Sequence, residues 1–584
     1  MAQSKWSASP SFSPDGARLA YISDAGGLPE VYVVSTVGGA PTKITSFQDP
    51  VGGVRWSPTE DRLAIVVSPG GGMNSQIYLA RSDGKDLVRI TDGEKDNNWL
   101  NTWTRDGKEL MFASNRRDPA AMDAYLYDVA AKQARLVAKN PGIGYLTGAT
   151  HDRRRALLYR MESRGNDNLF LVDDKGEQIL TAHEGPGSFF GELAPDDKTI
   201  YVGSNKDSDL VAFGKIAIDG APKPIETIIA RDDGELAIVA ISSRATAALV
   251  WNIAGRNELQ LVELATGKIL PSPAPPDELV HELVWSPDGN QLAVTLSGAT
   301  TPVNIFILAN GAWRQITQSP HDGVALAELV RPELVKLSAH DDLQLSGWLY
   351  RPRNATKPGP IVLSFHGGPE GQELPGLQSQ YQALVARGIA VFAPNVRGSS
   401  GFGKKFVNLD NGALRVDAVK DIKACVDYLV GANVADPKRI GIMGGSYGGY
   451  MTMAGVTEYP TMFAAAANLF GIVSFATFFE STEPWMAAIS KIEFGDPQTQ
   501  AELLKQLSPL NKVERIATPV IVLHGKNDTN VPLIEAEQIV ASLRKRKVPV
   551  EYVLFPDGGH GWQKTENKIK STVAIVRWFE THLR

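Results

Sequence analysis

A serine at the centre of Gly444-Gly-Ser-Tyr-Gly448 is the residue of this sequence best suited to chemistry. Residues 439–443 before it are mostly apolar, which predicts a buried strand, and the residues after it predict a helix. A serine at such a strand-to-helix turn exposes its hydroxyl from a strained backbone, where bulky neighbours would clash. The G-x-S-x-G spacing predicts that Ser446 is a nucleophile, and the alternative is an ordinary glycine-rich turn.

Two later loops carry the partners that a serine nucleophile needs. Asp528 follows the apolar run 520–523, and His560 follows the apolar run 552–555. A serine hydroxyl is a weak nucleophile until a base accepts its proton, and an aspartate can hold that base in the right tautomer. The chain order Ser446, Asp528, His560 is the order of an α/β-hydrolase triad, so we predict that these three residues are catalytic.

Three other residues compete for the roles of base and acid. His524 and His366 also stand at strand ends, and Asp557 lies close to His560. His524 precedes Asp528 in the same loop, which is the wrong order for the base. We therefore keep His560 as the predicted base.

The sequence His366-Gly-Gly-Pro369 directly follows the apolar run 361–365. A glycine pair at this place leaves a backbone N–H free to point into the site. We predict an oxyanion hole formed by the N–H groups of Gly368 and Tyr447, with Gly367 as the near alternative to Gly368. The plainer interpretation is a tight turn that needs glycine.

Composition excludes several classes of function. The chain has 584 residues with a formal net charge of -6 and no basic block, so we expect no nucleic-acid partner. No apolar run approaches the ~18 residues of a membrane span, so we expect no membrane contact. The one cysteine, Cys425, lies in a helical pattern and is predicted to be a buried packing residue. We expect no cofactor and no metal. The first residues lack the apolar core of a signal peptide, which favours the cytoplasm; the periplasm is the alternative if an export signal was trimmed.

The first half of the chain is repetitive. Phe12-Ser-Pro-Asp-Gly16 recurs as Trp56-Ser-Pro and as Trp285-Ser-Pro-Asp-Gly289, with fainter copies between them. Aligned positions 15, 60, 106, 152, 196, 243 and 288 are 44 to 47 residues apart, and short β-runs follow each turn. A period of this length with four strands per unit is typical of a β-propeller blade. We predict a seven-bladed propeller over residues 1–325, in which blades five and six are the least regular. A row of separate small β domains is the alternative.

Residues 326–584 have a different pattern, in which continuous apolar runs alternate with helical segments such as 416–430, 533–544 and 567–582. Runs that are apolar at every position suit strands covered by helices on both faces of a mostly parallel sheet. We therefore predict an α/β-hydrolase catalytic domain, with its chemistry in the loops at the carboxyl ends of the strands.

Together these motifs resemble the prolyl oligopeptidase family of serine peptidases, and His366-Gly-Gly-Pro369 is most similar to its acylaminoacyl-peptidase branch. The matching segments also include 395–403, 436–440, 444–449, 524–528 and 559–561. The resemblance implies that the propeller caps the active site and excludes folded proteins, so the expected partners are short peptide substrates. A homo-oligomeric state is left open.

The resemblance also implies substrate contacts. The segment 470–485 is similar to the family's S1-forming stretch, which makes Phe475 and Phe478 candidate pocket walls faced by Val531. Asn530 matches a position that helps to hold a substrate carbonyl in dipeptidyl peptidases. Arg397 lies in a matched turn where a structural ion pair is the expected role.

Two departures from the family pattern bear on specificity. The first blade starts almost at Met1, where the family usually has a preceding segment. No acidic pair matches the motif with which dipeptidyl peptidases hold a free N-terminus. An acylaminoacyl-peptidase-like oligopeptidase is therefore the leading prediction; the alternatives are a dipeptidyl or tripeptidyl aminopeptidase, a carboxylesterase with the same triad, and a binding platform with a decayed hydrolase domain.

Overall fold

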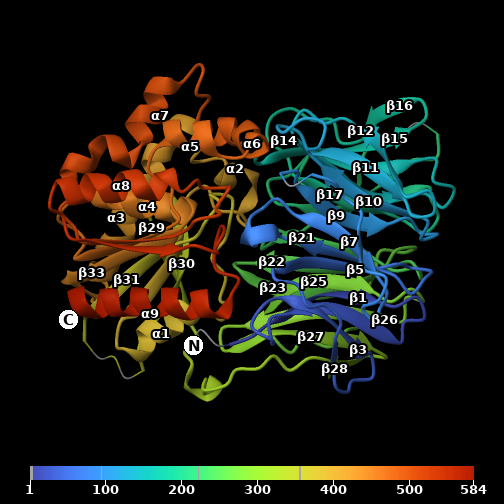
Figure 1. Ribbon diagram of the computed structural model, residues 1–584, viewed down its shortest axis with the longest axis horizontal. Coiled ribbons are helices and arrows are strands. Elements are labelled where there is room, and N and C mark those ends of the chain that lie inside the picture. Colours follow the sequence, from blue (N-terminus) through green and yellow to red (C-terminus); the bar gives the residue numbers. More distant parts are fainter. Residues whose placement is uncertain (1–3, 94, 221–222, 354, 356) are drawn as a thin grey trace.

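The structure is a computed structural model that describes residues 4–584 apart from residues 94, 221–222, 354 and 356. A β-propeller lies beside an α/β domain, and the two touch along one broad face (Figure 1). None of the helices in these described ranges is both long and apolar enough to cross a membrane.

The described residues of the propeller form seven four-stranded sheets, each from four consecutive antiparallel strands. The first four blades are β1 (Ser7–Phe12), β2 (Arg18–Ser23), β3 (Glu30–Ser35), β4 (Thr42–Lys43); β5 (Val51–Trp56), β6 (Leu63–Val67), β7 (Gln76–Ala80), β8 (Val88–Arg89); β9 (Asn98–Trp103), β10 (Glu109–Ser114), β11 (Asp123–Asp128), β12 (Gln133–Ala138); β13 (Ile143–Ala149), β14 (Ala156–Ser163), β15 (Asn166–Asp173), β16 (Gly176–Ile179). The other three are β17 (Phe189–Leu193), β18 (Thr199–Ser204), β19 (Ala212–Ala217), β20 (Glu226–Ile229); β21 (Glu235–Ile241), β22 (Thr246–Ile253), β23 (Arg256–Glu263), β24 (Lys268–Leu270); β25 (Leu279–Trp285), β26 (Gln291–Gly298), β27 (Thr301–Ala309), β28 (Ala312–Gln315).

The prediction of seven blades is confirmed, and each repeated turn joins the first two strands of its blade. Blades five and six, whose signatures are faint in the sequence, have the same four strands in the same order as the others. In these two blades the turn between the first and second strands lacks the Ser-Pro-Asp-Gly signature. The apolar strands that follow still pack against the neighbouring blades, as they do elsewhere in the ring. Packing between neighbouring blades sets the architecture here, and turn chemistry is secondary.

Among the described residues, seven hydrophobic clusters hold the propeller together, and each of them bridges two neighbouring blades. The cluster between blades seven and one joins Ile305 and Ile307 of β27 to Leu19 and Tyr21 of β2. No strand is shared across this seam, because blade one is complete within residues 7–43. The ring is therefore closed by the same kind of apolar packing that joins its other blades.

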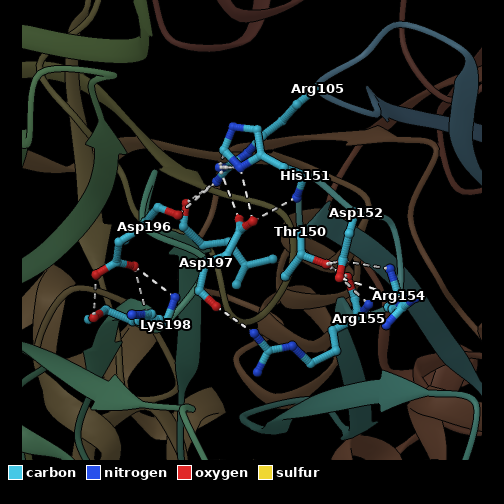
Figure 2. A network of polar contacts seen from close by, with 12 residues as sticks. Arg105, Thr150, His151, Asp152, Arg154, Arg155, Asp196, Asp197 and Lys198 are labelled. Carbon is cyan, nitrogen blue, oxygen red and sulfur yellow. Dashed lines mark hydrogen bonds and ion pairs between the residues drawn. The ribbon is translucent and has the colours of Figure 1, made fainter.

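Polar contacts reinforce the seams at the turns. Arg105, in the turn before β10, reaches past blade four to the carbonyls of Leu193 and Ala194 in blade five, both at 2.9 Å. The same guanidinium lies 3.2 Å from Asp197, which also accepts the backbone N–H of His151 from blade four (Figure 2). One arginine thus ties three blades together.

The described residues of the α/β domain form one eight-stranded sheet in the order β29-β30-β32-β31-β33-β34-β35-β36. The strands from β31 onward are parallel, and β29 and β30 pair antiparallel at one edge. The strands are β29 (Glu333–Ser338), β30 (Gln344–Tyr350), β31 (Gly359–Phe365), β32 (Ala390–Asn395), β33 (Ala435–Gly445), β34 (Ala465–Leu469), β35 (Val520–Gly525) and β36 (Val550–Phe555).

Helices cover both faces of this sheet, as predicted. Within the described residues they are α1 (Ser379–Ala386), α2 (Gly403–Val407), α3 (Arg415–Gly431), α4 (Tyr447–Glu458), α5 (Phe475–Ser481), α6 (Pro484–Phe494), α7 (Ala501–Leu507), α8 (Ile534–Lys545) and α9 (Thr565–His582). One large apolar cluster packs α3, α4 and α8 on one face, and a second packs α1 and α9 on the other (Figure 1). Cys425 is buried in the first cluster, as predicted.

Helix α6 joins the two domains. Its residues Trp485, Met486 and Ile489 are buried in the first α/β cluster, which extends into the propeller through Ile143 of β13. Trp99 of β9 meets the Trp485 ring edge-on at 5.3 Å. Helix α6 contacts β14, and the two elements lie side by side where the domains meet (Figure 1). The predicted boundary at residue 325 falls between the last blade strand, β28, and the first α/β strand, β29.

Candidate active site

Ser446 lies at the turn between β33 and α4, as its motif predicts. Its backbone has φ 57° and ψ -121°, a left-handed conformation that costs free energy for any residue with a side chain. The turn is held because the Ser446 N–H donates to the carbonyl of Leu469 at 3.0 Å. Ser446 also stands at the N-terminal end of α4, where unpaired backbone N–H groups favour negative charge.

The glycines around Ser446 permit close backbone contacts. A Cβ on Gly448 would lie 2.0 Å from the Phe365 carbonyl oxygen, and one on Gly444 would lie 2.3 Å from the Gly448 carbonyl oxygen. No side chain fits at these distances. The elbow therefore packs directly against the end of β31, which leads into the predicted oxyanion loop.

Asp528 and His560 come together at the ends of β35 and β36. His560 Nδ1 is 2.8 Å from Asp528 Oδ2, while Oδ1 of the same carboxylate accepts the N–H groups of Asn530 at 3.0 Å and Val531 at 2.9 Å. The Asp528 side chain has no exposed surface, and that of His560 is 19% exposed. The carboxylate is thus fixed by its own loop and oriented toward the imidazole, which suits an aspartate that sets the tautomer of a base.

Phe470 connects His560 to the elbow. The centroids of the Phe470 and His560 rings are 4.8 Å apart. A Cβ on Gly445 would lie 3.0 Å from Cζ of Phe470. Among the hydrogen bonds of the described residues, none joins Ser446 Oγ to His560. Such bonds are often long before a substrate is present, so the geometry leaves His560 in place as a candidate base.

The competing residues are engaged elsewhere. His524 is buried, its Nε2 lies 2.9 Å from the Val531 carbonyl oxygen, and burial lowers the pKa of its imidazole. Its Nε2 is 3.7 Å from Asp528 Oδ2, well beyond the His560 distance. Asp557 pairs with Lys564 at 2.7 Å on the surface. The described contacts thus single out His560 as the histidine bonded to Asp528.

The predicted oxyanion loop lies against the nucleophile. A Cβ on Gly367 would lie 3.4 Å from Ser446 Cβ, so this backbone passes directly beside the serine. Gly368 has φ 133°, and a Cβ there would meet the Glu370 nitrogen at 2.6 Å. Only glycine adopts this conformation without strain, which fits a loop shaped to present backbone N–H groups. The donor roles of Gly368 and Tyr447 stay predictions.

His366 is committed within this loop. Its Nδ1 lies 2.9 Å from the Gly367 carbonyl oxygen, and its Nε2 lies 2.9 Å from Ser399 Oγ. Burial lowers the pKa of the His366 imidazole. With both ring nitrogens engaged, His366 is placed to shape the loop and would have to break a contact to reach an oxyanion.

The predicted pocket residues need correction. Phe475 is 0% exposed, Phe478 is 2% exposed and Val531 is 1% exposed, and all three belong to the apolar cluster beneath α5 and α6. In this conformation they present almost no surface that a substrate could touch, because Phe494 packs against both phenylalanines. Asn530 is partly exposed in the Asp528 loop, and its substrate contact stays a prediction.

Arg397 forms the structural ion pair expected of it, with bonds of 2.9 Å to Asp421 and 2.8 Å to Asp341. Phe470 begins the segment 470–485 that resembles the S1-forming stretch, but its contact with His560 was not predicted, although a position one residue beyond β34 is where active-site residues often lie. No group of three or more described His, Cys, Asp and Glu residues could hold a metal ion.

The propeller reaches the catalytic loops as well. The carbonyl oxygen of Gly70, between β6 and β7, accepts a bond of 3.1 Å from the Asn527 side chain. A Cβ on Gly559, next to His560, would lie 1.9 Å from the Gly71 carbonyl oxygen. The loops that carry Asp528 and His560 are therefore packed directly beneath blade two.

Comparison with known proteins agrees with this architecture. Residues 375–584 match the profile described as "Prolyl oligopeptidase family", and residues 1–243 match "TolB beta propeller domain". The chain is 28% identical to dipeptidyl aminopeptidase BIII of Pseudoxanthomonas mexicana over 97% of this chain and 85% of the relative. It is 28% identical to the acylamino-acid-releasing enzyme of Rattus norvegicus over 41% of this chain and 34% of the relative. A structure solved in a study of two prolyl endopeptidases superposes with a TM-score of 0.87 at 15% identity, covering 100% of this chain and 90% of that one; at this identity it shows the fold alone.

Proposed function

The chain is a serine peptidase of the prolyl oligopeptidase family, and we propose that it hydrolyses short peptides in the manner of an acylaminoacyl-peptidase, through an acyl-enzyme on Ser446. The observation that carries the proposal is the 2.8 Å contact between His560 and Asp528, beside a serine held in a strained turn. The His366-Gly-Gly-Pro369 loop, packed against that serine, supports the same reaction.

Each residue has a defined task in this proposal. His560 takes the Ser446 proton as the hydroxyl attacks the substrate carbonyl, and Asp528 stabilises the imidazolium that forms. The backbone N–H groups of Gly368 and Tyr447 stabilise the oxyanion. His560 then gives its proton to the leaving amine. In the second half of the reaction His560 takes a proton from the attacking water and returns it to Ser446 Oγ as the acyl group leaves.

The propeller limits the size of the substrate in this proposal. It packs on the catalytic loops through the turn before β7 and through α6, which supports a restricted approach of folded proteins to Ser446 from that side. The family resemblance implies cleavage of peptides up to about 30 residues and none of native proteins, and the narrow channel of a propeller supports the same expectation. A ladder of peptides of increasing length, run beside a native globular protein, tests this; efficient digestion of the native protein would contradict it.

A second candidate, a dipeptidyl or tripeptidyl aminopeptidase, is favoured by one comparison. The dipeptidyl aminopeptidase of Pseudoxanthomonas mexicana matches nearly the whole chain, including the propeller, whereas the acylamino-acid-releasing enzyme matches 41% of it. A carboxylesterase would use the same groups on a more reactive bond. The state of the substrate's N-terminus separates the two peptidase candidates.

The test has two stages. Labelling by a fluorophosphonate, lost in Ser446→Ala, would establish the nucleophile; an unlabelled wild type would support a binding platform instead. Rates are then compared on acetyl-alanyl p-nitroanilide, alanyl-alanyl p-nitroanilide and p-nitrophenyl butyrate. Preference for the acetylated anilide supports the leading proposal, preference for the free dipeptide anilide supports the second, and activity on the ester alone supports an esterase.

A further inference from the structure

Arg164 reaches from the propeller into the oxyanion loop. It lies in the turn between β14 and β15, about two hundred positions before Gly368 and Glu370. Its Nη2 atom also lies 3.3 Å from the sulfur of Met486 in α6. Its guanidinium donates to Glu370 Oε2 at 2.8 Å and lies 3.5 Å from the Gly368 carbonyl oxygen. The Arg164 and Glu370 side chains are only 19% and 16% exposed, so water screens the pair weakly. The contact crosses the interface between the domains and ends on the glycine predicted to present an oxyanion donor.

Glu370 belongs to a larger cluster of buried charges. Arg415, which is fully buried, forms ion pairs with Asp410 and with Glu493. Burial raises the pKa of Asp410 to about 6, Arg415 opposes that rise, and the charge of Glu370 adds to it. The pKa of Glu493 is raised by burial as well, with Asp410 and Glu370 contributing. Three carboxyl groups thus share one neighbourhood in which Arg415 is one cation and Arg164 supplies another.

This cluster also fixes Tyr447, whose backbone supplies the other predicted donor. The Tyr447 hydroxyl donates to Asp410 Oδ2 at 3.3 Å, and the Arg415 guanidinium lies 4.8 Å from the centre of its ring. Tyr447 is 2% exposed, so its side chain is held on every side. Both predicted oxyanion donors are therefore attached to the same group of charges, one through Tyr447 and one through Glu370.

We propose that Arg164 is a positioning residue for the oxyanion hole, so that the docked propeller completes the geometry of the catalytic site. Arg164 holds Glu370 and the Gly368 carbonyl in place, and this fixes the direction of the loop's backbone N–H groups. The inference rests on the proposed hydrolysis at Ser446 and adds a residue outside the catalytic domain to it.

Removal of Arg164 has a definite physical consequence. Glu370 would then be a weakly solvated anion near Asp410 and Glu493, with Arg415 left to balance all three. Repulsion among these carboxylates, together with loss of the bond to the loop, would move residues 368–370 away from the position set by Arg164. An oxyanion donor displaced by a fraction of an ångström stabilises the transition state less, while ground-state binding of the substrate changes little.

The test compares kcat and KM for wild type, Arg164→Ala, Arg164→Lys and Glu370→Gln on acetyl-alanyl p-nitroanilide and p-nitrophenyl butyrate. Loss of a complete oxyanion donor costs about 10²- to 10³-fold in kcat, so we expect Arg164→Ala to lower kcat on the order of 10-fold or more, with KM changed less than about threefold. Arg164→Lys should restore part of kcat, because it returns the charge without the planar fork. The double variant Arg164→Ala/Glu370→Gln should lose little more than the worse of its two single variants.

Lys568→Met is the matched control, because Lys568 of α9 pairs with Asp24 of the propeller at 2.8 Å and contacts neither oxyanion segment. It should keep kcat near wild type even if the melting temperature falls. If Arg164→Ala does not fold, Glu370→Gln decides the question through a fall in kcat at unchanged KM and melting temperature. Wild-type kcat in Arg164→Ala, or an equal fall in the control, would overturn this inference alone. Wild type inactive on both probes would overturn the proposed function with it.

Discussion

The two domains of this protein distribute their apolar cores in different ways. The propeller divides its core into seven small clusters, each shared by two blades, while the α/β domain gathers its core into two large clusters on the faces of one sheet. The large cluster behind the active site includes Ile143 and Met122 of the propeller, so the boundary between the domains is not a boundary of the core there. The apolar contacts that stabilise the propeller are spread around its ring, whereas the chemistry depends on a few loops at one edge of the sheet in the α/β domain.

The strongest test of this division removes the predicted catalytic groups. Ser446→Ala and His560→Ala should each lower kcat/KM by at least about 10⁴-fold, because nucleophile and base act as one unit. The double variant should lose little more than either single variant, and the melting temperature should stay close to that of wild type. Losses that add in the double variant would show that His560 is not the base for Ser446.

A second test asks whether all seams of the ring are equivalent. Ile305→Ala cuts into the ring-closing cluster, and Leu157→Ala cuts into the cluster between blades four and five; both side chains are 0% exposed. Each should destabilise by about 2–5 kcal/mol, since large-to-small changes in a core leave a cavity. Both should lower the melting temperature with kcat unchanged in the folded enzyme.

Val37→Ala serves as the control for the seam variants, because Val37 is 77% exposed and should tolerate the change. A much larger loss of stability in Ile305→Ala than in Leu157→Ala would identify the closing seam as the weak point of the ring. That result would contradict the expectation that all seven seams contribute equally to the stability of the ring.

A third test separates loop shape from direct catalysis. Both ring nitrogens of His366 are engaged within its own surroundings, so His366→Ala should lower kcat by less than the roughly 10²-fold expected for a true oxyanion donor. The measurement is kcat/KM on one ester and one amide across pH. A loss of ~10³-fold at every pH, with the fold intact, would show that His366 donates to the oxyanion directly.

The smallest expected effect concerns a buried acid of the propeller. Burial raises the pKa of Asp167 in β15 from 3.8 to about 7, although it accepts the Phe189 N–H. An acid whose pKa is higher when folded binds protons more readily in the folded protein. Its contribution to stability is therefore fully present below pH ~4 and is lost as pH rises toward 7.

Asp167→Asn removes this titration and keeps the acceptor for Phe189. We expect the variant's melting temperature to decline less than that of wild type between pH 4 and pH 7. Asp174→Asn, at an exposed position just beyond β15, should leave the slope of wild type unchanged. An unaltered slope in Asp167→Asn would show that the group is already ionised across this range.

Features with a local signature could be predicted from the sequence. The spacing of the Ser-Pro-Asp-Gly turns gave seven blades, and the glycines around Ser446 gave the elbow, because each constraint acts within a few residues. Strands such as β33 and helices such as α9 were predicted within a few residues of their bounds. The pairing of Asp528 with His560 was predicted from chain order together with the rule that parallel strands bring their loops to one edge.

Features that depend on distant contacts were missed. Phe475 and Phe478 were predicted to line a pocket, but Phe494 at the end of α6 packs against both, and nothing in the segment 470–485 indicates that contact. The approach of Arg164 to Glu370 was not predicted for the same reason. A residue's partners two hundred positions away are set by how whole domains dock, which a short pattern does not encode.

The completeness of the first and last blades has a topological consequence. Each blade consists of four consecutive strands. The chain could therefore start at any blade, in a circularly permuted order, without dividing a sheet. Ser7 and Ser319 lie within a hydrogen bond of each other, at 3.1 Å between their hydroxyl oxygens. A circular permutant of the isolated ring, joined there by a short linker and opened between any other two blades, would keep all seven sheets whole. The place at which the chain opens the ring is therefore set by the order of the blades in the gene, and the sheets themselves do not determine it.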